Sequence, residues 1–253
     1  STTGDHPSTR LEGESVVSWV HPVTNEQQMT IFGGYTSSYK DDVYTLNLAT
    51  RVWSGKVSTT GTAPTKRSSH SAVSWIDSTN NPQMTVYGGH VQDYYNGPDA
   101  SYSAEIHTFD LVNSVWTGVV ATTGAVSGQL GGQRCDHSAL GWIDSGNNPQ
   151  MTIFGGGPYM GYEFGCLRCQ HKADTKTLDL RSMVWSGPVP STGARPIATA
   201  YTGAPKYMPA VRLVDQATSS MKVLILDGRI IPSQNMPYGN RFFITSITGS
   251  LEL

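Results

Sequence analysis

Three cysteines and one histidine are the clearest candidates for metal chemistry in the sequence. Cys166 and Cys169 form a C-x-x-C pair, His171 follows two residues later, and Cys135 lies upstream. Thiolates and an imidazole in this combination could hold a tetrahedral zinc ion. A single C-x-x-C without a second ligand pair is weak support for zinc, however. The odd cysteine count also allows a disulfide from Cys135 to Cys166 or Cys169, or free thiols, and these two alternatives are favoured over zinc.

Tyrosines form a second group of candidate functional residues, because most of them fall in the segments between recurrent apolar runs. A tyrosine combines a flat apolar ring with a polar hydroxyl, which suits the binding of proteins or sugars. Two interpretations stay open: a binding surface, or rings that pack long loops onto the strands. The residues proposed for the binding surface are Tyr35, Tyr39, Tyr94, Tyr95, Tyr102, Tyr159 and Tyr162.

Catalytic patterns are missing from the sequence. We find no nucleophile with an adjacent base, no paired carboxylates and no phosphate-binding loop, since the run Gly155–Gly157 opens no helical pattern. Arg67 with His70, and Arg134 with His137, form two Arg-x-x-His pairs at equivalent positions. Recurrence favours a structural hydrogen bond over a role in catalysis or metal binding. We therefore expect a non-enzymatic protein and, apart from the zinc alternative, no cofactor.

The composition narrows the class of partner. Charged residues make up 14% of the 253 residues and the formal net charge is -2, so nothing favours nucleic acid or an anionic membrane surface. No apolar run approaches the roughly 18 residues of a membrane span, so we expect no membrane insertion. No targeting signal assigns a compartment.

The elements that must position these residues are repeated. An apolar run ends in a glycine pair in Met29–Gly34, Met84–Gly89 and Met151–Gly156, and Val223–Gly228 is a degenerate fourth copy. An apolar segment precedes each run, and two further strand patterns follow it after a variable loop. All six tryptophans recur at two equivalent positions, Trp19, Trp75 and Trp142 in the first segment and Trp53, Trp116 and Trp185 in the last. Each unit is predicted to be a four-stranded antiparallel meander, with a tryptophan core in the first three; the fourth lacks the tryptophans.

The glycine pair after an apolar strand, the aromatic third strand and the later tryptophan resemble kelch repeats, and the Arg-x-x-His pairs are similar to the family pattern. This resemblance implies an all-β fold, a β-propeller of four-stranded antiparallel blades, with the first strand of each blade innermost. One propeller region then covers residues 1–253, with units at about 1–57, 58–120, 121–190 and 191–253.

The ring itself is expected to be larger than four units. Propellers have about four to eight blades, but kelch propellers usually resemble rings of six or seven, so we expect a longer parent protein or partner segments to complete the ring. Ser58–Gly61 follows a fourth strand and recurs as Ser1–Gly4. The chain is thus expected to begin where a preceding blade would end.

The variable loops between second and third strands should lie on the same face as the connections between units. They run from Tyr35 to Asp41, from His90 to Ala104 and from Gly157 to Ala173, and they contain the tyrosines. We expect a protein-interaction or scaffold module that presents this tyrosine-rich face within a larger protein or assembly. The alternatives are a carbohydrate or small-molecule binding module, or a kelch-type enzyme resembling galactose oxidase or sialic-acid mutarotase, although no copper-ligand constellation can be matched.

Overall fold

The computed structural model describes residues 2–7, 11–91, 102–124, 132–157, 159–163, 166–169, 174–187, 191–193, 210–215, 220–226 and 242–250. Side chains are described for residues 2–7, 11–91, 102–124, 132–157 and 174–187. All regular elements in these ranges are β-strands, and none of the described residues forms a helix that could span a membrane. The chain divides into two compact units, Ser1–Thr122 with Gly132–Cys135, and Thr123–Gly131 with Asp136–Leu253.

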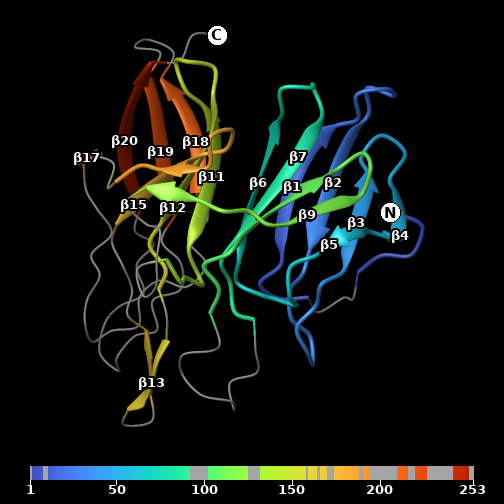
Figure 1. The fold of residues 1–253 in the computed structure, drawn as a ribbon, viewed down its shortest axis with the longest axis horizontal. Helices are drawn as coiled ribbons and strands as arrows, with labels where there is room; N and C mark the ends of the chain where they lie inside the picture. The colour runs from blue at the N-terminus through green and yellow to red at the C-terminus, as the bar shows by residue number, and fades with distance from the viewer. Residues whose placement is uncertain are drawn as a thin grey trace. The chain divides into compact units, whose positions relative to one another are not determined.

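The first unit contains two sheets, which we call the first and second blades (Figure 1). The first blade has the order β1-β2-β3-β4, and the second has the order β5-β9-β8-β7-β6. In both, four strands that follow one another in sequence form the predicted antiparallel meander. The strands are β1 (Ser15–Val20), β2 (Gln27–Phe32), β3 (Val43–Asn47), β4 (Val52–Lys56), β5 (Thr60–Thr62), β6 (Ser71–Ile76), β7 (Pro82–Tyr87), β8 (Ile106–Asp110) and β9 (Val115–Val119).

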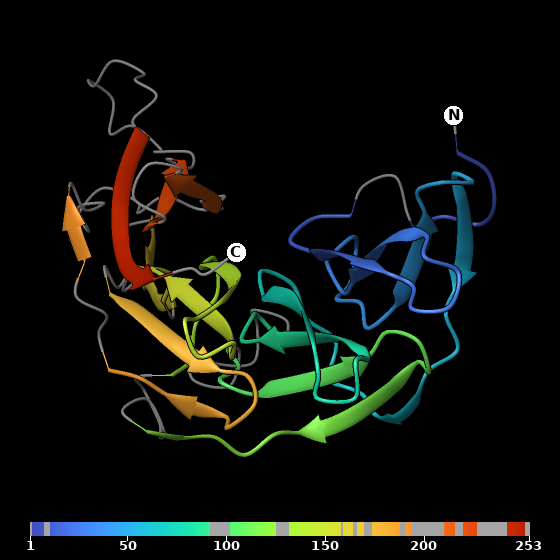
Figure 2. The same ribbon diagram turned by 90° about the horizontal axis from the view of Figure 1, so that it is seen from above.

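The second unit contains the third and fourth blades (Figure 2) and a separate two-stranded hairpin, which is labelled β13 in Figure 1. The third blade, β10-β16-β15-β12-β11, repeats the order of the second. The fourth differs, because β17 pairs antiparallel with β20 at the edge of the β18-β19-β20 meander. The strands are β10 (Thr123–Gly124), β11 (Ser138–Ile143), β12 (Pro149–Phe154), β13 (Tyr159–Glu163), β14 (Cys166–Cys169), β15 (Thr175–Asp179), β16 (Val184–Trp185), β17 (Ser191–Gly193), β18 (Ala210–Asp215), β19 (Ser220–Leu226) and β20 (Phe242–Ser250).

A short parallel strand before the meander is the feature that the sequence pattern did not predict. Thr60 pairs with Val115 in parallel orientation, and Thr3 makes the equivalent bridge to Val52. A Cβ on Gly61, whose φ is +78°, would lie 2.0 Å from the Trp116 carbonyl oxygen. Only glycine fits this close approach. The Ser-Thr-Thr-Gly motif therefore belongs to the blade that follows it.

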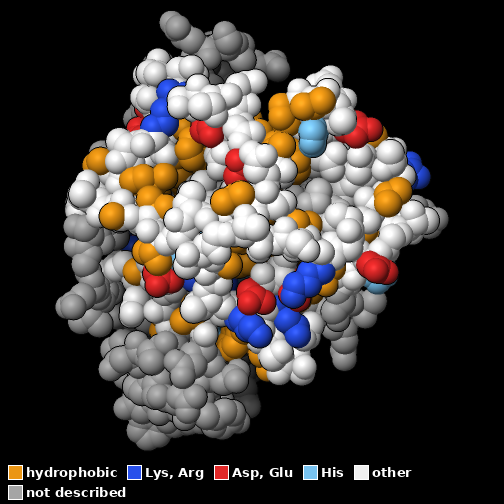
Figure 3. All heavy atoms as spheres, turned by 45° about the vertical axis from the view of Figure 1, so that its right-hand side comes forward, with side chains coloured by type: hydrophobic (Ala, Val, Ile, Leu, Met, Phe, Trp, Pro, Cys, Tyr) orange, Lys and Arg blue, Asp and Glu red, His pale blue; other side chains and the backbone are white. Residues whose placement is uncertain are grey.

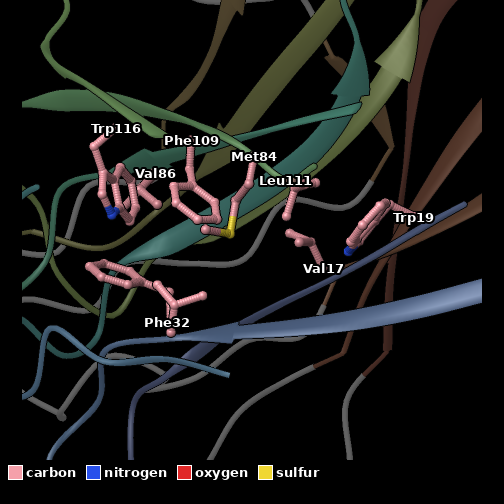
Figure 4. Close-up of a cluster of buried hydrophobic side chains, with 9 residues drawn as sticks. Val17, Trp19, Phe32, Met84, Val86, Phe109, Leu111 and Trp116 are labelled. Carbon is pink, nitrogen blue, oxygen red and sulfur yellow. The ribbon is translucent and has the colours of Figure 1, made fainter. Parts of the chain in front are cut away.

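The core of the first unit lies between its two blades. Val17, Trp19 and Phe32 of the first blade face apolar side chains of the second (Figure 4). The Phe32 ring lies 4.9 Å from the Trp116 ring, centroid to centroid, in a tilted arrangement that aromatic pairs favour. The second-blade members of this core are Met84, Val86, Phe109, Leu111 and Trp116.

The indole N–H groups of the tryptophans in the first strands also donate hydrogen bonds inside the sheet. The indole N–H of Trp19 donates to the Thr30 hydroxyl at 2.9 Å, and Trp75 makes the same bond to Thr85. Trp142 repeats it in the third blade, with a length of 2.8 Å. Trp19 lies in the core as predicted, whereas Trp75 and Trp142 are only half-buried. The recurring hydrogen bond fixes each indole.

Candidate functional site

The blades of the first unit have two structurally different ends. At what we call the turn end, residues 21–26, 48–51, 77–81 and 111–114 join neighbouring strands. At the loop end, the connection that enters a blade pairs with the segment after its glycine pair: Glu12 with Tyr35, and Ser68 with His90, through N–H···O bonds of 2.8 to 3.0 Å. The β2–β3 loop and the entering connection therefore share one end, as expected.

Four aromatic side chains form a continuous row across the loop end of both blades. The ring centroids of Tyr35 and Tyr39 are 5.1 Å apart, those of Tyr39 and His90 5.2 Å, and those of His90 and Tyr102 4.9 Å. A hydrogen bond joins the Tyr39 hydroxyl to Nδ1 of His90. Tyr39 belongs to the first blade and His90 to the second, so this aromatic row, Tyr35, Tyr39, His90 and Tyr102, links the blades.

Exposure is uneven along the aromatic row. Tyr102 is buried, with 6% of its surface exposed. Tyr35, Tyr39 and His90 are partly exposed. One ring therefore packs the loop onto the blade, while the other three keep surface available to a ligand.

A carboxylate at the loop end of the second blade, three residues after Tyr102, is held by three donors. Oε2 of Glu105 accepts hydrogen bonds from Nη2 of Arg67 at 3.2 Å, from Nε2 of His107 at 3.2 Å and from the Ser103 hydroxyl at 3.3 Å. Arg67 is fully buried, and its Nη1 donates to the Gly88 carbonyl at 2.8 Å. The Glu105 side chain is 44% exposed. An oriented carboxylate is thus presented to solvent.

The charge states of this group follow from its contacts. Burial alone would raise the pKa of Glu105, but the hydrogen bonds from His107 and Arg67 outweigh it and lower that pKa. Burial lowers the pKa of His107, although Glu105 opposes this shift. At neutral pH Glu105 is therefore ionised and His107 is neutral, with Nε2–H as the donor to the carboxylate.

An acidic residue recurs just before the third strand of three blades, each with a basic partner. Asp42 pairs with Lys56 in the first blade, which raises the pKa of Lys56. Glu105 pairs with Arg67 in the second, and Asp174 lies 3.5 Å from Lys176 in the third. Each of these acidic residues thus has a basic side chain close to it. On the face shown in Figure 3, several Lys and Arg side chains gather in the lower part with acidic side chains beside them.

The Arg-x-x-His pair before β6 has a structural role, as predicted. Nε2 of His70 is hydrogen-bonded to the Ser15 hydroxyl of the first blade at 2.8 Å, and its ring meets Phe32 edge-on at 5.2 Å. The Arg67 carbonyl accepts the N–H of Gly34 at 2.8 Å. A Cβ on Gly33, at φ +67°, would lie 2.8 Å from both the Arg67 oxygen and Cε1 of His70. The glycine pair therefore makes room for the Arg-x-x-His segment of the next blade.

The predicted metal ligands are only partly described. Cys135 is buried, Cys166 and Cys169 lie in β14 without described side chains, and His171 lies outside the described residues. Within the described part of the chain, no group of three His, Cys, Asp or Glu residues could hold a metal ion. Zinc, a disulfide and free thiols stay predictions.

The remaining predicted tyrosines have the same status. Tyr94 and Tyr95 lie outside the described residues. Tyr159 and Tyr162 lie in β13, where the backbone pairs with Cys169 and Leu167 of β14, and their side chains are not described. Their role in binding stays a prediction.

His90 and Glu105 are the site residues that the sequence reasoning missed. His90 follows Gly89 as Tyr35 follows Gly34, so its position after the glycine pair was the available signal. Glu105 comes three residues after Tyr102, as Asp42 comes three residues after Tyr39. An alignment of the units on the glycine pair and on the third strand would have identified both.

Comparison with known proteins identifies the repeat. The family model of the KLHDC2/KLHL20/DRC7 kelch-repeats domain matches residues 1–205. No curated protein matches the chain. A chain from the cryo-EM structure of RAG in complex with one melted RSS and one unmelted RSS is similar, with a TM-score of 0.54 and 14% sequence identity over 99% of this chain and 83% of that chain. At this identity the likeness shows the fold alone.

Proposed function

The chain belongs to the kelch-repeat family of all-β propellers, and on that basis we propose that it is a non-enzymatic module that binds another protein through the loop end of its blades. The strands supply a rigid support, and the loops that differ between blades supply the contacts. In this proposal the module acts as a scaffold within a larger protein or assembly.

The observation that carries this proposal is the aromatic row. Tyr35, Tyr39 and His90 are partly exposed rings from two blades, and each ring is held by a neighbouring ring about 5 Å away. Rings that are already fixed lose little conformational entropy on binding, and tyrosine is enriched among residues that dominate interface energies. Tyr94, Tyr95, Tyr159 and Tyr162, in the other loops, are further candidate contacts in this proposal.

The Glu105 carboxylate adds a hydrogen-bond acceptor of fixed orientation to the surface. Its Oε2 is occupied by Arg67, His107 and Ser103, and part of the side chain remains exposed. An acceptor that is already oriented suits a backbone amide or a hydroxyl of a partner, because no rearrangement is needed. The low charge of the chain gives no support for a nucleic-acid partner.

A carbohydrate ligand is the second candidate, and the same geometry favours it. Sugars bind through stacking of their apolar faces on aromatic rings and through hydrogen bonds from their hydroxyls to fixed carboxylates. The aromatic row and Glu105, both at the loop end, offer these two kinds of contact. The two candidates share the surface but differ in the ligand.

Site-specific crosslinking distinguishes them. A photoreactive phenylalanine analogue replaces Tyr35 at the loop end or, as the control, Val23 in the turn-end loop of the same blade, which is 84% exposed. The two variants are irradiated in extract from the source cells, and the wild-type protein is applied to a glycan array.

We expect a discrete protein adduct from position 35 and none from position 23. Equal adducts from both positions, or no adduct from position 35, would contradict the protein-binding proposal. A glycan signal that is lost in Tyr35→Ala would favour the carbohydrate candidate instead.

A further inference from the structure

An exposed serine lies at the tip of the loop between β2 and β3. Tyr35 and Tyr39 face each other in an antiparallel bridge, so residues 36–38 form the tip of this loop, and Ser38 is exposed there. The backbone hydrogen bond described within the tip runs from the Thr36 N–H to the Ser38 carbonyl at 3.2 Å. A tip held by so few bonds opens locally at a small cost in free energy, so an enzyme can reach the serine hydroxyl.

The Ser38 hydroxyl has an ammonium group beside it. Nζ of Lys40 donates a hydrogen bond to Oγ of Ser38 at 3.2 Å. The hydroxyl accepts this bond and, among the described residues, donates to no other group. A phosphate attached to Oγ would therefore place its oxygens within reach of a charge-assisted hydrogen bond from Lys40.

The backbone of Lys40 is held on both sides. Its N–H donates to the Gly34 carbonyl at 2.9 Å, and its carbonyl accepts the N–H of Arg67 at 2.9 Å. Arg67 belongs to the connection that enters the second blade, so two segments distant in sequence fix the start of the lysine side chain. The ammonium group therefore stays close to the tip when the tip itself opens.

Two aspartates follow Ser38 where a kinase with a basic substrate groove could bind them. Asp41 and Asp42 come three and four residues after Ser38, and they are the only two adjacent acidic residues in the sequence. Asp42 is paired with Lys56, whereas Asp41 is partly exposed. Opposite charges on two partners favour encounter and correct register. The Asp41 carboxylate is thus a recognition element for a kinase that selects acidic residues after its target serine.

A second serine shows that the sequence pattern alone does not define such a site. Ser74 also has an aspartate, Asp77, three residues later. However, Ser74 lies inside β6, where it pairs with Met84 of β7, and its hydroxyl donates to the Ser18 carbonyl at 2.8 Å. A kinase could reach this hydroxyl only after the strands had separated. The structure therefore favours Ser38 over Ser74.

We propose that Ser38 is a phosphorylation site for an acid-directed protein kinase, and that Lys40 holds the phosphate beside the aromatic row. In the transfer, Oγ of Ser38 attacks the γ-phosphorus of a Mg²⁺-bound nucleoside triphosphate in the kinase. The Oγ–P bond forms, and the bond from the γ-phosphorus to the nucleoside diphosphate oxygen breaks. The hydroxyl proton passes to the carboxylate base of the kinase.

The phosphate changes the charge of the loop end. It carries about −1.5 to −2 charges at pH 7, which is comparable with the formal net charge of -2 for the whole chain. This charge would be added in the loop that contains Tyr35 and Tyr39, two rings of the aromatic row. The modification does not depend on the function proposed above. Its consequence, a change in binding at the aromatic row, rests on that function.

A kinase reaction on the folded 253-residue chain tests the site. The protein is incubated with an acid-directed serine kinase, Mg²⁺ and ATP, and the phosphate is located by mass spectrometry. We expect phosphate on Ser38 and none on Ser74. Asp41→Asn should slow the reaction at Ser38 by at least about fivefold, because the recognition carboxylate is lost. Ser37→Ala, which truncates the exposed neighbour, should react as the wild type does.

Three results of this reaction would overturn the proposal. The first is the absence of phosphate from Ser38, and the second is modification of Ser74 at a similar rate. The third is an unchanged rate at Ser38 in Asp41→Asn.

The role of Lys40 is tested on protein that carries phosphoserine incorporated at position 38 during synthesis. A nearby ammonium should lower the second pKa of the phosphate below that of a phosphopeptide with the same loop sequence, as measured by ³¹P NMR titration. Lys40→Gln should return this pKa toward the peptide value. Arg51→Gln, which removes an exposed cation at the turn end of the same blade, should leave it unchanged.

Identical titration of the phosphate in the wild type and in Lys40→Gln would overturn the role of Lys40. Neither the kinase reaction nor the titration involves a partner. A failure of the function proposed above would therefore leave both results unchanged, and the two proposals can fail separately.

Discussion

The turn end and the loop end of the blades close the same strands in different ways. At the turn end, the turn after the third strand repeats one solution in the first three blades, in which the last residue of that strand accepts two backbone N–H groups. Asn47, Asp110 and Asp179 each do so with their Oδ1 atom, at 2.7 to 3.0 Å. At the loop end equivalent positions carry different residues, such as Tyr35 and His90. The repeat is thus uniform in the turn after the third strand, whereas it diverges at the loop end.

Substitution of a glycine in the glycine pair is expected to show the largest difference in stability between the two ends. A Cβ on Gly89, whose φ is +98°, would lie 2.7 Å from Cβ of His70 and 2.8 Å from the Ser68 carbonyl oxygen. Gly89→Ala should lower the free energy of unfolding by about 3 kcal/mol, because strain and a backbone clash add together. Chemical denaturation measures the change.

A turn-end glycine is the matched control for this substitution. Gly146 meets only the flexible ends of Asn148 and Asp144, and its equivalent in the second blade is already Thr79. Gly146→Thr should change the free energy of unfolding by less than about 0.5 kcal/mol. Similar losses for Gly89→Ala and Gly146→Thr would show that the two ends do not differ in packing constraint.

At the loop end we expect a smaller, pH-dependent effect on stability from the carboxylate of Glu105. Its pKa is lowered below the ordinary 4.5 in the folded protein, so the ionised form stabilises the fold above that pH and loses this contribution as the pH falls through the lowered pKa. Glu105→Gln should cost about 1 kcal/mol at pH 7, a modest value because the group is partly exposed. Denaturation of both proteins across pH 3 to 7 should show the difference shrinking toward acid. A difference that is constant with pH would exclude the ionised network.

The repeated elements could be predicted from the sequence because each strand leaves its own signal. The tryptophans, the glycine pairs and the alternating apolar residues identified the meander and its core. The parallel strand at Thr60–Thr62 could not be predicted, because a three-residue polar segment has no periodicity. Its only mark was the repeated Ser-Thr-Thr-Gly motif, whose pairing partner is set by tertiary structure.

The location of three candidate residues in the loops could be predicted, but their contacts could not, and their role in binding stays a prediction. Tyr35, Tyr39 and Tyr102 followed from their position in the loops. His90 and Glu105 became visible only with the structure, because their partners Tyr39 and Arg67 are distant in sequence. The Tyr39–His90 contact depends on how the two blades pack, and the Glu105–Arg67 contact depends on how the entering connection meets the third strand. Residue type and local spacing encode neither.

The central claim, that the loop end is the interaction surface, is tested most directly by partner affinity after two matched truncations. Tyr35→Ala removes a partly exposed ring at the loop end, and Val23→Ala removes an exposed side chain at the turn end of the same blade. With the protein captured by crosslinking as ligand, calorimetry should show a loss of about tenfold or more for Tyr35→Ala, as for other aromatic interface residues. Val23→Ala should bind as the wild type does. Unchanged affinity in Tyr35→Ala, or equal losses in both variants, would contradict the account.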